Sequence, residues 1–152
     1  MGNIRKPAVA GQFYTENSNL LDETISNFFA NYAKKSSPDL NKKIRAIISP
    51  HAGYVYSGET AADTFYTTKN FSYKQAVILA PSHHSRFEGI ALSNYTGYET
   101  PLGVLKSDQK ITQKLLNSQY FTSKNNAHEN EHAIEVQLPF LQNLSLRLAL
   151  MV

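Results

Sequence analysis

The sequence contains no cysteine. The chain can therefore form no disulfide, has no thiolate nucleophile and cannot bind a metal through a cysteine sulfur. Any metal has to be held by nitrogen and oxygen atoms. Such donors suit iron, zinc, copper or manganese better than they suit cluster chemistry.

Long hydrophobic runs and clusters of one charge are also scarce. No stretch is long and apolar enough to span a membrane, and the first residues lead into no signal-like core. The net charge of +3 comes from dispersed lysines, without a basic stripe and interleaved aromatics. With 152 residues, 41% of them hydrophobic, the chain is ample for one domain and short for two. We expect one cytoplasmic α/β domain that binds neither membrane nor nucleic acid.

Two short apolar runs each end close to a histidine. Residues 44–48 and 76–80 are bounded by polar residues and proline, a pattern that predicts buried strands. His51 follows the first run, and His83 and His84 follow the second. Open α/β sheets build their sites at the carboxyl ends of strands. If the strands are parallel neighbours, His51 and one of the other two histidines converge as a metal or proton-transfer site requires. The alternative is loop histidines that face solvent.

A third histidine segment matches two zinc-hydrolase patterns, H-E-x-x-H and H-x-x-E-H, over residues 128–132. On a continuous helix, His128 and His132 would share one face and could both bind zinc, with a glutamate as base. Such a site needs a third ligand, and no acid, cysteine or histidine follows Glu135. The alternative is the first turn of a helix, where acidic side chains favour the positive end of the dipole.

Helices are predicted at residues 18–34, at 58–66 after a Ser57 cap, and through 111–116 after a Ser107 or Asp108 cap. Pro139 should kink or restart a further helix that includes Ile134 and Leu141.

A third strand is predicted at residues 89–93, followed by a turn-rich connection at 95–103. The chain ends at residues 144–152 in an apolar, strand-like run without a polar tail. Such an end exposes a sheet edge unless something covers it. We therefore expect residues 1–152 to be a single domain that is incomplete at its C-terminus, and pairing through that edge would give a homo-oligomer.

Several segments, taken together and in order, resemble the Memo-like family, whose bacterial members form the B component of the AmmeMemoRadiSam system. The segments are residues 5–14, 48–54, 56–58, 79–84, 100–103 and 131–141. The resemblance implies a fold similar to class III extradiol dioxygenases. That fold is a LigB-like α/β sandwich in which helices flank a mixed or parallel central sheet.

The resemblance also implies a metal site. His51 and His83 match two metal ligands of the family, and His132 matches a motif histidine that lines the same cleft. The implied cofactor is an iron or copper ion, with zinc as a further option, and no organic cofactor is implied. The family's remaining ligand is a cysteine in its C-terminal half, and this chain contains no cysteine.

From these implications we expect a non-haem, dioxygenase-like oxidoreductase that acts on an unidentified small molecule. His132 would transfer a proton, and Glu131 or Glu135 would orient it. Tyr54, His84 and Glu135 are expected to line the cleft.

Two alternatives remain open at this point. One is a binding module of the phosphotyrosine-peptide type, without turnover. The other is a zinc hydrolase that uses His128 and His132. By family, radical SAM and AMMECR1-like proteins are the expected partners.

Overall fold

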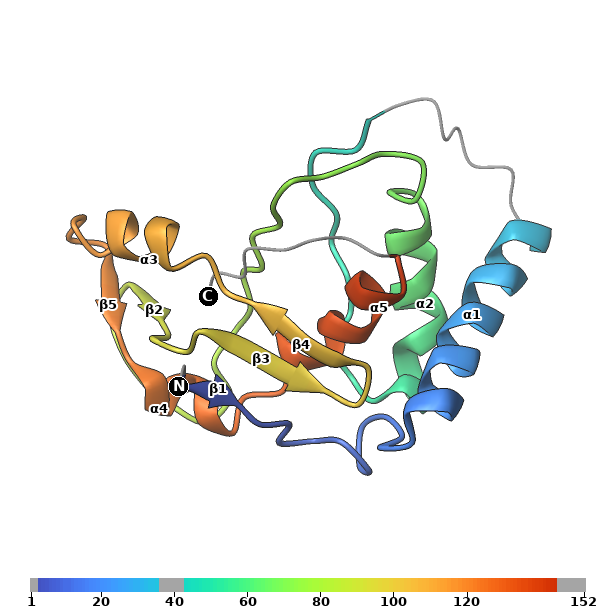
Figure 1. The fold of residues 1–152 in the computed structure, drawn as a ribbon, viewed down its shortest axis with the longest axis horizontal. Helices are drawn as coiled ribbons and strands as arrows, with labels where there is room; N and C mark the ends of the chain where they lie inside the picture. Colours follow the sequence, from blue (N-terminus) through green and yellow to red (C-terminus); the bar gives the residue numbers. More distant parts are fainter. Residues whose placement is uncertain (1–2, 36–42, 145–152) are drawn as a thin grey trace.

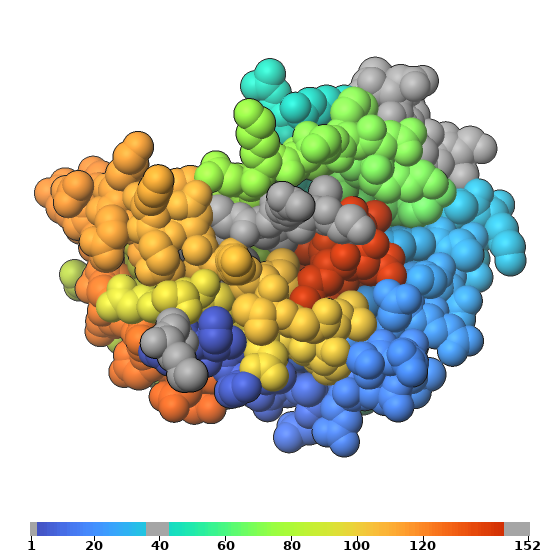
Figure 2. Space-filling model, viewed as in Figure 1, coloured from blue at the N-terminus to red at the C-terminus, as the bar shows by residue number. Residues whose placement is uncertain are grey.

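The computed structural model describes residues 3–35 and 43–144, which form a mixed α/β structure (Figure 1). Its helices are α1 (Ser18–Lys35), α2 (Tyr54–Tyr66), α3 (Gln109–Leu115), α4 (Asn125–Glu129) and α5 (Leu138–Asn143), with a 3-10 helix η1 (Glu135–Gln137) before α5. Its strands are β1 (Ile4–Arg5), β2 (Ile90–Leu92), β3 (Gly97–Thr100), β4 (Gly103–Lys106) and β5 (Phe121–Ser123). Figure 2 shows α1 at one end of the molecule and the segments of α3, β5 and α4 at the other.

The strands form a mixed sheet and a separate parallel pair. β1 pairs in parallel with β3, β3 pairs antiparallel with β4, and β2 pairs in parallel with β5. The predicted loop at residues 95–103 therefore overlaps the β3–β4 hairpin, which runs from Gly97 to Lys106 and has Gly103 at a φ of 115° after its turn. A sequence prediction missed it because both strands are short and lack clean alternation. The expected combination of a mixed sheet with flanking helices is confirmed.

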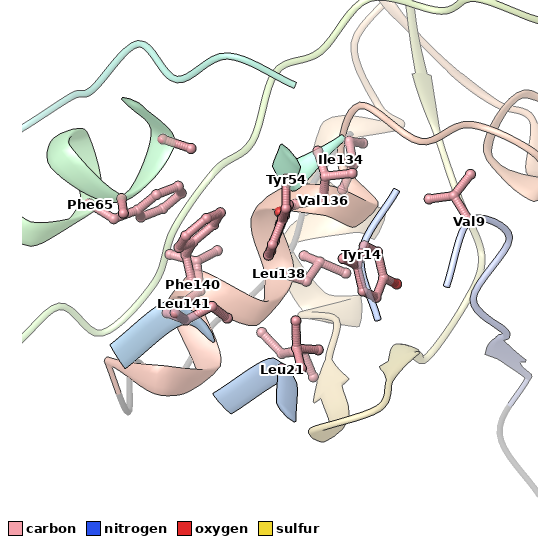
Figure 3. Packing of buried hydrophobic residues seen from close by; sticks show 14 of the residues in the cluster. Val9, Tyr14, Leu21, Tyr54, Phe65, Ile134, Val136, Leu138, Phe140 and Leu141 are labelled. Atoms are coloured by element: carbon pink, nitrogen blue, oxygen red, sulfur yellow. The ribbon is translucent and has the colours of Figure 1, made fainter. Parts of the chain in front are cut away.

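The hydrophobic core lies where α1, α2 and α5 pack together against the sheet. Leu21, Ile25 and Phe29 form the buried face of α1, as the four-residue spacing predicted. Phe140 of α5 is the largest fully buried side chain of this core. Its ring stacks on Phe65 (Figure 3), with 5.2 Å between ring centroids and an interplanar angle of 10°.

Sequence signals predicted where three helices begin, and two of these predictions are confirmed. α5 restarts at Leu138 with Pro139 in its first turn, as expected. The Asp108 side chain caps α3 by accepting the backbone N–H groups of Lys110 and Ile111. The predicted start of α2 after Ser57 is wrong, because Gly53 is its N-cap and the helix begins at Tyr54.

The two strands predicted at residues 44–48 and 76–80 are wrong as strands. Both segments are extended, but neither pairs in a sheet with any described residue. Their apolar side chains nevertheless alternate: Ile78 packs against the core, whereas its neighbours Val77 and Leu79 are 58% and 72% exposed. The apolar pattern reports which side chains are buried, whereas a strand also requires a backbone partner in register.

The two extended segments still lie side by side at both ends. The Tyr73 hydroxyl donates a hydrogen bond to the Ile44 carbonyl at one end. At the other end the rings of His51 and His83 lie 5.3 Å apart. The segments therefore run in the same direction and deliver their histidines to one place.

The third predicted strand is confirmed as β2, within residues 89–93. The strand predicted at residues 144–152 falls almost entirely outside the described residues. No helix in the described ranges is both long and apolar enough to cross a membrane.

We expect Phe140→Ala to lower the free energy of unfolding by about 3–5 kcal/mol, because it leaves a cavity between Phe65 and Tyr54. Urea unfolding followed by circular dichroism measures this loss. Tyr120→Ala is the matched control, since that ring is 65% exposed, and should change stability by less than about 0.5 kcal/mol. Equal losses in both variants would contradict the proposed core.

Candidate metal centre

Three histidines from separate parts of the chain meet at one point. His51, His83 and His132 each offer one ring nitrogen, and these three atoms lie within 4.8 Å of one another. The ring centroids of His83 and His132 are 4.4 Å apart, and those of His51 and His132 are 5.9 Å apart. The convergence of His51 with His83, expected from the sequence, is found in the structure.

His51 is held by contacts to the residues on either side of it. The side chain of Gln137 donates a hydrogen bond to the Pro50 carbonyl at 3.0 Å. After His51, the Tyr54 N–H donates to the Phe13 carbonyl at 2.7 Å.

Glu131 holds His83 at two points. One carboxylate oxygen accepts the His83 backbone N–H at 2.6 Å, and the other lies 2.9 Å from its ring Nδ1. The second oxygen also accepts the Ala133 N–H at 2.9 Å. Although burial raises the pKa of Glu131, these bonds from His83 and Ala133 lower it to about 2. Glu131 is therefore an anion at neutral pH.

His132 occupies a more enclosed position than His83. Its side chain is 15% exposed, whereas that of His83 is 38% exposed. The Phe13 ring packs on it, with centroids 4.7 Å apart. Burial lowers the pKa of His132, and the neighbouring histidines lower it further, while Glu131 opposes them. The favoured neutral imidazole is the form that binds metals.

His128 lies outside this cluster. α4 ends at Glu129, so the continuous helix over residues 128–132 that would place His128 and His132 on one face does not exist. His128 is buried, and its Nε2 and Nδ1 contact the Ala91 carbonyl and the Tyr98 hydroxyl at 3.1 Å and 3.3 Å. The five-residue pattern was misleading because the backbone leaves the helical conformation at Asn130.

The residues expected to line the cleft have different surroundings. His84 is exposed beside the cluster, with its ring centroid 6.4 Å from that of His132. Tyr54 is buried and donates its hydroxyl to the Val136 carbonyl. Glu135 is 1% exposed and contacts the N-terminal arm through Arg5 and Tyr14 rather than His132.

Sequence reasoning missed the roles of Arg5, Phe13 and Gln137 around the site. Arg5 donates hydrogen bonds to the carbonyls of His128 and Glu131. Its contacts span more than 120 residues of sequence, and no local pattern reports such a pairing.

Together, the fold and the cluster define an α/β protein with a candidate mononuclear metal centre. The sequence profile described as "Memo-like protein" matches residues 5–151. The chain belongs to this family.

Individual relatives agree with that assignment. MEMO1 family protein TV1383 of Thermoplasma volcanium is 38% identical over 140 residues, which cover 91% of this chain and 50% of the relative. The protein memo-1 homolog of Caenorhabditis elegans is 38% identical over 140 residues, covering 91% and 39%. A MEMO1 family protein of Aquifex aeolicus is 36% identical over 147 residues, covering 95% and 51%. The chain spans about half the length of the curated relatives it matches.

We expect Glu135→Gln to destabilise the fold by about 3–5 kcal/mol, because it leaves the buried Arg5 charge without its partner. Denaturant titration measures the loss. Glu99→Gln is the matched control: it breaks the exposed pair with Lys6 and should cost less than about 1 kcal/mol. Similar costs for the two variants would contradict the stabilising role of the buried Arg5–Glu135 pair.

Burial lowers the pKa of His128 below its ordinary value of 6.5, and the Arg5 charge adds to this effect. The unfolded chain therefore binds a proton at this residue at a higher pH than the folded chain does. The free energy of unfolding should fall as the pH drops below 6.5. In His128→Gln that fall should be shallower. Urea midpoints between about pH 7.5 and 5 test this, and equal slopes in both proteins would contradict it.

Proposed function

We propose that His51, His83 and His132 together bind one transition-metal ion, and that the protein is a cytoplasmic, dioxygenase-like oxidoreductase of the Memo-like family. The observation that carries this proposal is the approach of three ring nitrogens to within 4.8 Å of one another. The proposal gives His132 the role of third ligand instead of the proton-transfer role expected from the sequence.

The chemistry of the donor set fits this class of metal. Imidazole nitrogen suits iron, copper and zinc, and three histidines are a known ligand set of catalytic sites. A carboxylate behind a ligating histidine is also typical of metal centres, and Glu131 stands in that position behind His83. A bound iron or copper ion would supply redox chemistry at this point.

The residues around the cluster control access to it. The His83 side chain is 38% exposed, so a small molecule can approach from that side. Phe13 packs on His132 and shields its ring from water. The protein's part is to bind the ion through the three imidazoles and to leave one side open to a small-molecule substrate.

We expect the purified chain to bind about one equivalent of Fe(II), and His51→Ala, His83→Ala and His132→Ala each to weaken binding by at least about tenfold. Equilibrium dialysis under anaerobic conditions, followed by elemental analysis, measures both quantities. Copper and zinc are tested in parallel, because a given nitrogen-donor site generally binds Cu(II) more tightly than the other first-row divalent metals.

Two matched variants control this experiment. His84→Ala removes an exposed histidine next to His83 and should leave binding unchanged. His128→Gln should also retain the metal; loss of zinc in this variant but not in His51→Ala would favour the zinc hydrolase. A folded wild-type chain that binds none of the three metals would overturn the proposal.

A binding module without turnover is the second candidate. Val55 and Tyr56, shortly after His51, are 87% and 86% exposed, and such apolar side chains favour contact with a peptide. A pull-down with phosphotyrosine peptides that is insensitive to chelator would support this function. Radical SAM and AMMECR1-like partners remain a proposal for the whole protein.

A further inference from the structure

We propose that Glu131 is a positioning residue that fixes His83 in one tautomer, with the hydrogen on Nδ1, so that Nε2 is its metal-binding atom. The inference rests on the proposed metal centre. Its signature, however, is a property of the metal-free protein and can be measured without any metal.

The two contacts between Glu131 and His83 fix both the backbone and the ring of the histidine. The backbone N–H donates to Oε2 at 2.6 Å, and ring Nδ1 lies 2.9 Å from Oε1. Each carboxylate oxygen already accepts a backbone N–H, Oε2 that of His83 and Oε1 that of Ala133. The carboxylate is therefore the acceptor toward Nδ1 as well, and Nδ1 carries the hydrogen. A neutral ring then has its free electron pair on Nε2.

The same carboxylate also orders the backbone at His132. Oε1 accepts the Ala133 N–H at 2.9 Å and lies 3.4 Å from His132 Nδ1. From the other side, Arg5 donates to the Glu131 carbonyl at 2.7 Å. One buried side chain therefore holds two of the three histidines in place.

This arrangement leaves Glu131 unsuited to the catalytic role that the sequence suggested. It is 5% exposed, and three donors from His83 and Ala133 already occupy its two oxygens. A general base needs a free oxygen within reach of the substrate proton. Glu131 acts through His83 instead.

The direct test is a long-range ¹H–¹⁵N correlation spectrum of the histidine side chains in the metal-free protein near neutral pH. We expect wild-type His83 to show the Nδ1–H tautomer. In Glu131→Gln, the amide can donate as well as accept, so His83 should lose this single tautomer. His83 found as the Nε2–H form in the wild type, or unchanged in the variant, would overturn the inference.

Metal affinity gives a second readout. Glu131→Gln should weaken binding of Zn(II) and Fe(II) by about 10–100-fold, as is typical when the partner of a ligating histidine is lost. Glu129→Gln is the matched control, because Glu129 is exposed two residues away, and should change neither tautomer nor affinity. Undiminished affinity in folded Glu131→Gln would count against the inference.

Glu131→Asp covers the case in which the glutamine variant does not fold. It keeps the charge but is one carbon shorter, so it should retain only part of the tautomer preference and of the affinity. Full retention of both would contradict the positioning role. A wild-type chain with the expected tautomer but without metal binding would overturn the proposed function while supporting the Glu131–His83 contact.

Discussion

The buried carboxylate of Glu135 is the constraint on which the rest of the structure depends. It is 1% exposed and accepts hydrogen bonds from the N-terminal arm: the Arg5 guanidinium, the backbone N–H groups of Ala8 and Val9, and the Tyr14 hydroxyl. A buried charge without partners is very costly, so the arm and η1 cannot separate without a large loss of stability. This contact fixes the position of residues 131–137 in the fold.

The three histidines belong to no helix or strand, so the site depends on that segment. His51 precedes α2, His83 follows an extended segment, and His132 lies between α4 and η1. Residues 131–137 reach both of the other segments, through Gln137 to Pro50 and through Glu131 to His83. The segments are therefore held at their histidine ends by side chains, even though neither pairs in a sheet with a described residue.

Local sequence patterns predicted those features that depend on residues close together in the sequence. The apolar runs before His51 and His83 indicated where these histidines would meet, and Pro139 indicated where α5 begins. The contacts of Glu131 with His83 and of Glu135 with Arg5 were not predictable in this way, because the partners lie 48 and 130 residues apart in the sequence. Alternation in an apolar run likewise reports one buried face, but it cannot say whether a neighbouring strand is present.

The central claim is that His51, His83 and His132 act as ligands of a single ion in this Memo-like chain. X-ray absorption spectroscopy of the chain loaded with one equivalent of Fe(II) tests it most directly, because imidazole rings produce a characteristic multiple-scattering pattern. The claim predicts a fit with three imidazoles in wild type and two in His132→Ala. A fit with two imidazoles in both proteins would contradict the claim. His132 would then not be a ligand, and the proton-transfer role expected from the sequence would be favoured.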